Sequence, residues 1–197
     1  MTRLVLASAS PARLATLRSA GLAPEVVVSG VDESQVRITE PAALATELAR
    51  LKAEAVATRV PDAVVVGCDS VLCLDGAVHG KPADAAEATA RWRSMRGRSG
   101  VLHTGHCVVA PDGRRVLRGA ATTVHFADVT DREIDAYVAT GEPLHVAGAF
   151  TVDGLGGAFV RGIEGDHHYV VGISLPLLRE MLAEVEVAWV SLWSGPS

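Results

Sequence analysis

The chain has 197 residues, a length typical of one domain of generous size. Hydrophobic residues make up 49% and charged residues 21%, so the chain can bury a core and is not of the disordered class. Its formal net charge of -5 argues against a broad basic face for nucleic acid, although a local pocket can still attract a small anion. Aromatic residues are only 4%, which predicts a core built mainly from Val, Leu, Ile and Ala.

Cysteine content and hydropathy indicate a reduced, cytoplasmic protein. Three cysteines, Cys68, Cys73 and Cys107, are odd in number and widely spaced, unlike a disulfide framework, and we expect them to be mostly buried. His103 and His106 lie near Cys107 in the sequence, and these residue types can ligate a metal. Because no C-x-x-C pair accompanies them, a zinc site is the weaker interpretation. The N-terminus lacks the long apolar core of a signal peptide, and no apolar run is long enough for a membrane span.

The first stretch of the chain predicts a short strand, a turn through small residues and a helix. Ser10 is a good N-cap, Pro11 suits the first helical position, and Gly21 suits the helix end. A helix N-terminus offers free N–H groups, to which Ser8, Ser10 and Arg13 add hydroxyls and a charge. This combination predicts a phosphate-binding site. An ordinary strand–turn–helix with a polar cap remains open on this stretch alone.

Two predicted elements follow before the central strand. We expect a strand over residues 25–29 and a helix from Pro41 to about Thr58, whose apolar residues recur at helical spacing. Lys52 lies inside this helix. A lysine in a helix is usually a solvated surface residue, and that is the simple interpretation of Lys52.

Asp69 is the carboxylate whose position in the sequence points most strongly to a functional role. It lies between an apolar run over residues 63–67, typical of a strand buried on both faces, and a second extended run over 71–74. An acid in such a place is costly unless it is solvated, paired or bound to metal. The alternative is a bend aspartate, after the end of the first strand, that bonds its own backbone.

Turn signals organise the middle of the chain. Asp75–Gly76 predicts a hairpin turn. In Gly80–Pro82 the glycine permits a close approach and Lys81 could meet a phosphate, although the motif is too short for a phosphate loop. We then expect a helix bracketed by Asp84 and Gly97, with Ala88, Trp92 and Met95 buried, and strands over residues 101–110 and 116–126.

The C-terminal part mixes helices with glycine-rich backbone. A helix over residues 130–140 has the capping box Thr130 and Glu133. We expect bulged strands and tight turns over 147–165, a helix opening at Ser174, and a final strand over 187–193. Alternating strands and helices followed by strands predict an α/β domain with a mixed sheet.

These motifs, taken together and in order, resemble the Maf family of nucleotide pyrophosphatases over nearly the whole chain. The matching segments are Ser8-Ala9-Ser10-Pro11-Ala12-Arg13, Asp32-Glu33, Lys52-Ala53, Gly67-Cys68-Asp69-Ser70, Gly80-Lys81-Pro82, Thr104-Gly105, Tyr137 with Gly141-Glu142-Pro143, Ala147-Gly148-Ala149-Phe150, and Gly165-Asp166 with Val171-Gly172-Ile173-Ser174-Leu175. Each motif alone is weak, but their joint order and spacing are specific.

The resemblance implies a fold, a domain organisation and a reaction. The fold would be an elongated mixed sheet flanked by helices, with two lobes around a cleft, similar to that of inosine triphosphate pyrophosphatases. One domain would span residues 1–197. The reaction would be hydrolysis of nucleoside triphosphates to the monophosphate and pyrophosphate with a divalent metal, Mg²⁺ or Mn²⁺.

The resemblance also implies roles for single residues. Asp69 would be the general base and, with Glu33, a metal ligand; two acids and a triphosphate suffice for magnesium. The phosphates would be held by Ser8, Ala9, Ser10, Arg13, Lys52 and Lys81.

Three positions would set the base preference, namely Ala12, Ser70 and Asp153. Each differs from the residue in the family subgroup that prefers thymidine and uridine triphosphates, so that preference is not carried over. An ionised Asp153 accepts hydrogen bonds but cannot donate them, which suits a base edge rich in donors, such as guanine or cytosine. This assignment is a hypothesis.

Three functions stay open. The first is a nucleoside triphosphate pyrophosphatase. The second is a nucleotide-binding regulator of septum formation with little turnover, since the family is associated with arrest of septum formation. The third is a house-cleaning hydrolase of modified nucleotides. Metal-dependent pyrophosphate release separates the hydrolases from the regulator, and the sequence leaves a homodimer open.

Overall fold

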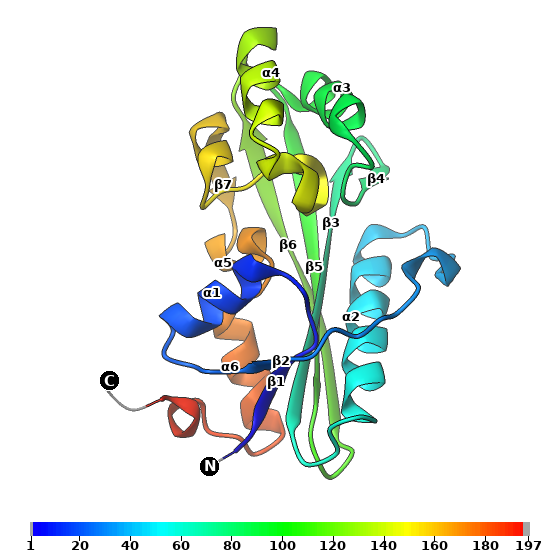
Figure 1. Cartoon of the computed structure of the whole chain (residues 1–197), viewed down its shortest axis with the longest axis vertical. Coiled ribbons are helices and arrows are strands. Elements are labelled where there is room, and N and C mark those ends of the chain that lie inside the picture. The colour runs from blue at the N-terminus through cyan, green and yellow to red at the C-terminus, as the bar shows by residue number, and fades with distance from the viewer. Residues whose placement is uncertain (1, 195–197) are drawn as a thin grey trace. The chain divides into compact units, whose positions relative to one another are not determined.

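Seven strands form one mixed sheet in the computed structural model, which describes residues 2–194 (Figure 1). In chain order the strands are β1 (Leu4–Leu6), β2 (Glu25–Val26), β3 (Val64–Leu74), β4 (Ala77–His79), β5 (Ser99–Val109), β6 (Arg115–Phe126) and β7 (Val160–Glu164). Their order in the sheet is β2–β1–β3–β5–β6–β7, with β4 paired to β3. β1 is parallel to β2 and β3, whereas β4 and β7 pair antiparallel with β3 and β6. The predicted mixed α/β fold is confirmed.

Helices flank this sheet. They are α1 (Pro11–Ser19), α2 (Pro41–Ala57), α3 (Ala85–Met95), α4 (Asp131–Ala139), α5 (His167–Val171) and α6 (Leu175–Glu184). Short 3-10 helices are η1 (Glu33–Gln35), η2 (Glu142–His145), η3 (Ala147–Ala149), η4 (Leu155–Phe159) and η5 (Trp189–Leu192). Within residues 2–194, none of the helices combines the length and the apolar character that crossing a bilayer requires.

The chain divides into two compact units, in keeping with the two lobes that the resemblance implied. The first unit comprises the chain up to Asp69, residues 104–120 and the chain from Gly172 onward. The second comprises Ser70–His103 and Ala121–Val171. β3, β5 and β6 each contribute residues to both units.

Strand alternation builds the core of the first unit. Leu4 and Leu6 of β1 belong to a cluster with Leu17 of α1 and Met181 of α6, while Val5 belongs to a separate cluster with residues of α2. Successive residues of a strand point to opposite faces of the sheet, so both faces are buried here. The same alternation holds in β3, where Val64 and Val66 belong to the first cluster and Val65 to the second. It explains the continuous apolar run over residues 63–67 that predicted a central strand.

The predicted core of Val, Leu, Ile and Ala is confirmed, and in the second unit a cluster of aromatic rings is added to it. The fully buried Trp92 packs edge-to-face against Tyr137, Phe126 and Phe159, with ring centroids 5.5, 5.8 and 5.8 Å apart. Phe150 packs in the same way on Phe126. The few aromatic residues are therefore concentrated in one unit, where edge-to-face pairs add to the stabilisation from buried area.

Three predicted elements differ from the structure. The strand over residues 25–29 is shortened to the two residues of β2. The stretch 147–165, expected to form bulged strands and tight turns, contains η3 and η4 before β7, so only its last part is a strand. The final strand over 187–193 is wrong, since Trp189–Leu192 forms η5 and Trp193 makes only an isolated bridge to Leu22.

Candidate active site

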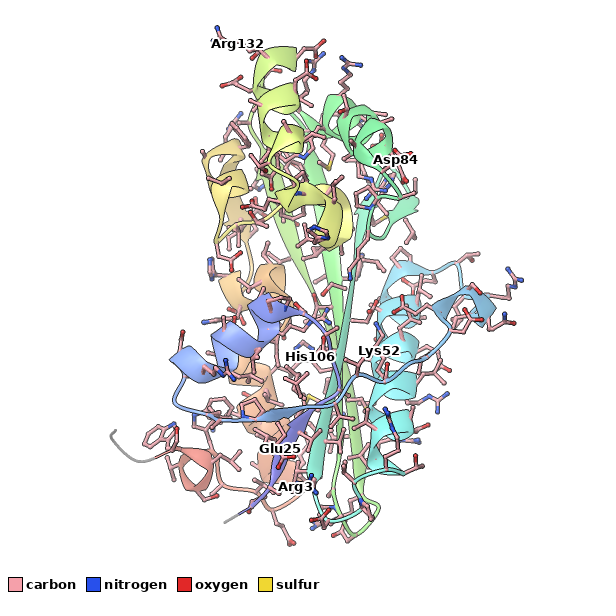
Figure 2. The ribbon with its side chains drawn as sticks, viewed as in Figure 1. Arg3, Glu25, Lys52, Asp84, His106 and Arg132 are labelled. Carbon is pink, nitrogen blue, oxygen red and sulfur yellow. The ribbon has the colours of Figure 1, made fainter. Side chains whose placement is uncertain are left out.

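The contact between α2 and the sheet of the first unit depends on two glycines. A Cβ on Gly67 would lie 2.4 Å from the Ala49 carbonyl oxygen, and one on Gly105 would lie 2.3 Å from the Ala45 carbonyl oxygen. Real Cβ atoms do not come so close, so any side chain there would push the helix away. The close approach brings Lys52 to the sheet-facing side of α2, where Figure 2 shows it.

Lys52 joins two carboxylates. Its Nζ donates to Asp69 Oδ1 at 2.5 Å and lies 2.7 Å from Glu33 Oε1. The side chains of Lys52 and Asp69 are only 13% and 11% exposed, whereas that of Glu33 is 52% exposed. The surface interpretation of Lys52 is therefore wrong. The bend interpretation of Asp69 is also wrong, because β3 continues through this residue and its carboxylate is paired with a distant helix.

The surroundings of Asp69 change its acidity. Burial raises the pKa of this carboxyl, and the positive charges of Lys52 and Arg13 oppose the shift without cancelling it. The charge of Glu33 adds to the increase. A carboxylate with a raised pKa is a stronger proton acceptor, and such perturbed groups are typical of catalytic positions.

Arg13 is fixed at the start of α1. Its Nε donates to the Gly172 carbonyl at 2.9 Å, and its Nη1 donates to the Cys68 carbonyl at 2.9 Å and to Ser8 Oγ at 3.1 Å. The predicted cap is confirmed, with Ser10 Oγ accepting from the Arg13 N–H at 3.4 Å. The guanidinium is thus held beside the residue that precedes Asp69.

The parallel pairing of β1 and β3 explains why these residues meet. Leu6 is the partner of Val66, and the Ala7 N–H donates to the Val66 carbonyl at 2.8 Å. The turn after β1, with Ser8 and Ala9, therefore lies at the carboxyl end of β1, beside the stretch of β3 that leads to Asp69. Ligand sites in α/β proteins form at the carboxyl ends of parallel strands.

The predicted metal ligands partly meet the requirements of a divalent cation. Glu33 and Asp69 approach the same ammonium nitrogen, so the two carboxylates can share one cation. Asp32 instead caps η1, where its Oδ1 accepts from the backbone N–H and hydroxyl of Ser34. No group of three or more His, Cys, Asp or Glu side chains with the makings of a metal site occurs within the described chain. Magnesium tolerates this, because it keeps waters and substrate oxygens as ligands.

His103, His106 and Cys107 form no group of three metal ligands within residues 2–194. The buried His106 accepts a hydrogen bond at Nε2 from the Ser174 N–H at 2.9 Å, so this nitrogen is used at the start of α6. Cys107 is buried, and burial raises its pKa to about 12. A thiol with that pKa is a poor metal ligand at neutral pH.

Three other predicted site residues, Ser70, Lys81 and Asp153, lie in the second unit. Lys81 is exposed after β4, Ser70 is half-buried in β3, and Asp153 is exposed between η3 and η4. Ala12, the remaining specificity position, lies in the first turn of α1 in the first unit.

Sequence reasoning missed the role of Glu142. Its carboxylate accepts four hydrogen bonds: from Tyr137 Oη at 2.9 Å, Thr151 Oγ1 at 2.5 Å, and the N–H groups of Leu155 and Gly156 at 3.0 Å each. These bonds fix the loop that carries Asp153. The glutamate was visible only as one letter of a G-E-P motif, which does not reveal its partners.

A mixed α/β fold with a buried carboxylate–lysine pair beside an anchored arginine and a capped helix N-terminus defines an enzyme for a phosphorylated small molecule. Comparison with known proteins names the family. The chain belongs to the family of Maf-like proteins, whose family model matches residues 3–185.

Similar proteins support this assignment. A protein of Salinispora tropica called nucleoside triphosphate pyrophosphatase is 62% identical over 198 residues, covering 98% of this chain and 88% of that protein. A Streptomyces coelicolor protein of the same name is 60% identical over 195 residues, covering 98% and 95%. A crystal structure of a nucleoside-triphosphatase (dITP/XTP pyrophosphatase) from Mycobacterium abscessus overlaps 65% of this chain and 76% of its own, with 19% identity and a TM-score of 0.42. This last likeness is too distant to bear on the site.

Proposed function

We propose that this chain hydrolyses nucleoside triphosphates between the α- and β-phosphates, giving the monophosphate and pyrophosphate. The observation that carries the proposal is the buried Asp69–Lys52 pair, at 2.5 Å, beside the anchored Arg13. Close relatives named for this activity support it.

Asp69 is the general base in this reaction. It accepts a proton from the attacking water, for which its raised pKa is suited. Lys52 keeps the carboxylate ionised and correctly oriented before the substrate arrives. General-base catalysis of this kind contributes about 10²–10⁴-fold to the rate.

The phosphates bind to groups that are already in place. Arg13 is anchored by three internal bonds, so little side-chain entropy is lost when it meets an anion. Ser8, Ala9 and Ser10 lead into the N-terminus of α1, where the helix dipole favours negative charge. We also assign phosphate binding to the exposed Lys81.

Glu33 and Asp69 are the residues that would hold a divalent cation, Mg²⁺ or Mn²⁺. When bound, such a cation neutralises phosphate charge and polarises the bond that breaks. The shared contact of both carboxylates with Lys52 supports this assignment, because it shows two anionic groups converging on one positive charge.

Base preference, location and assembly remain proposals of finer detail. We assign base selection to Ala12, Ser70 and Asp153, with Asp153 favouring guanine or cytosine through its acceptor oxygens. Three free cysteines, two of them buried, fit a reducing compartment such as the cytoplasm. A single domain over residues 1–197 and a homodimer both stay predictions.

Pyrophosphate release from a panel of eight common and several methylated nucleoside triphosphates tests the proposal, with and without Mg²⁺ or Mn²⁺. Asp69→Asn is the test variant. Asp62→Asn is the matched control, because Asp62 is an exposed aspartate whose carboxylate accepts from Arg3 at 2.8 Å. We expect metal-dependent release that Asp69→Asn abolishes and Asp62→Asn preserves.

Two results would contradict the proposal. Triphosphate binding without any release would favour the regulator of septum formation, and full activity in Asp69→Asn would remove the assigned base. Release from methylated nucleotides alone would instead make the enzyme a house-cleaning hydrolase with the same chemistry.

A further inference from the structure

The loop that carries Lys81 is held at both ends by one helix. Lys81 itself is exposed. On its N-terminal side, the Gly80 carbonyl accepts from Arg91 Nη1 at 2.6 Å and from the Gly148 N–H at 3.0 Å. On its C-terminal side, the Ala83 N–H donates to Glu87 Oε2 at 2.7 Å. The backbone around an exposed lysine is therefore fixed.

Arg91 and Glu87 form one hydrogen-bonded pair that contacts both ends of the loop. They lie one turn apart on α3, and Arg91 Nη2 donates to Glu87 Oε1 at 2.5 Å. Each carboxylate oxygen thus has its own donor, while the guanidinium spans the carboxylate and the Gly80 carbonyl. The planar, rigid fork of arginine presents separate N–H groups to the two acceptors in a fixed geometry, which a single ammonium nitrogen does not do.

The burial of Arg91 shows that these contacts are specific. Its side chain is only 4% exposed, whereas Glu87 is 47% exposed. A buried guanidinium is costly unless its donors are used, and a surface pair at this spacing would contribute little. The buried guanidinium of Arg91 thus stabilises the backbone of the loop that carries the exposed Lys81.

We infer that Glu87 and Arg91 are positioning residues for Lys81, which they hold ready to bind the polyphosphate of the substrate. The inference rests on the proposed function and extends it to residues that touch no substrate. With the loop held, Lys81 loses less entropy on binding, so the affinity for the anion rises.

The test is a double-mutant cycle with Lys81. Glu87→Gln is the primary variant, because Glu87 is half-exposed and the amide keeps the shape; Arg91→Lys is the second, since it keeps the charge but loses the fork. We expect each to raise KM for the preferred triphosphate about fivefold to tenfold, with kcat within about twofold, as for the loss of one positioning bond. In a Lys81→Met background the same changes should leave KM unchanged. Arg93→Lys is the matched control, because Arg93 is exposed on the same helix and pairs only weakly with Asp131, at 3.3 Å.

The cycle separates positioning from folding. A merely structural role would lower activity equally with and without Lys81, and that result would overturn the inference, as would an unchanged KM in Glu87→Gln and Arg91→Lys. If the wild-type protein releases no pyrophosphate, the proposed function fails by itself. Calorimetric affinity for inorganic tripolyphosphate then replaces KM in the same cycle, with the same two readings.

Discussion

Replacing Asp69 with asparagine should abolish activity without lowering stability. Burial raises the pKa of Asp69, so the ionised carboxylate costs folding free energy at neutral pH, about 1.4 kcal/mol for each unit of pKa. Asp69→Asn recovers that cost but weakens a charged hydrogen bond worth about 1.5–3 kcal/mol. Lys52 meanwhile keeps Glu33 at 2.7 Å. We expect the free energy of unfolding at pH 7 to stay within about 1 kcal/mol of the wild-type value.

The sign of the pH dependence follows from proton binding. An aspartate in the unfolded chain titrates near about 3.9, and Asp69 titrates higher in the folded chain. Between these two pKa values the folded state binds more protons than the unfolded state, so this group lowers stability as the pH rises. Asp69→Asn lacks the effect, and its stability relative to the wild type should therefore increase from about pH 4 to pH 7.

Replacing Lys52, the positive partner of Asp69, should by contrast lower the free energy of unfolding. Lys52→Met leaves the Asp69 charge buried without its nearest partner, which costs about 3–5 kcal/mol. The double variant Lys52→Met/Asp69→Asn should recover most of this loss. The matched control is Lys81→Met, because Lys81 is exposed and its removal should leave stability unchanged.

Urea unfolding followed by tryptophan fluorescence measures these stabilities, and pyrophosphate release measures the activity of the same samples. A loss of more than about 2 kcal/mol in Asp69→Asn would refute the reasoning, because the attraction of Lys52 would then outweigh desolvation. A harmless Lys52→Met would refute it equally.

Three further predictions concern other parts of the molecule. Burial alone would raise the pKa of Glu142, but its hydrogen bonds lower this pKa overall. Glu142→Gln should therefore lower the free energy of unfolding in urea by about 1–3 kcal/mol at pH 7, and the loss should shrink as the pH falls towards 4. An equal loss at both pH values would exclude the charge of Glu142 as its source. Gly67→Ala should destabilise by about 1–3 kcal/mol and raise KM, because its Cβ would meet the backbone of α2. Gly162→Ala is the control, because nothing lies within 4 Å of its Cβ, and equal thermal midpoints of the two variants would contradict the close packing. Chelation with EDTA should stop pyrophosphate release and added Mg²⁺ or Mn²⁺ should restore it, and release that continues in EDTA would argue against the cation assigned to Glu33 and Asp69.

Local signals predicted the helix boundaries well. The Ser10 cap of α1, the capping box of Thr130 in α4 and the Asp75–Gly76 turn were all readable, and all are confirmed. Each depends on residues only a few positions apart, whose side chains bond the nearby backbone or tolerate a positive φ.

Features that depend on distant partners were not readable. The strand end expected at Asp69 is absent, since β3 continues through this residue and Lys52 pairs with its carboxylate. This pairing could not be predicted, because Lys52 lies 17 residues away and on another element. Arg13 was identified as a phosphate ligand, but its anchor at Gly172 is 159 residues away. The motifs of the Maf-like family placed these residues in one site, which composition and periodicity could not do.

The division of the chain into units affects how the protein is made. The chain passes from one unit to the other four times, three of them inside β3, β5 and β6. Neither unit is therefore a continuous piece of sequence. The core around Leu4 and Leu6 includes Leu178 and Met181 of α6, so β1 completes its packing only after α6 has been synthesised. Until then part of this apolar strand stays exposed in the nascent chain, and such exposed segments are prone to aggregate.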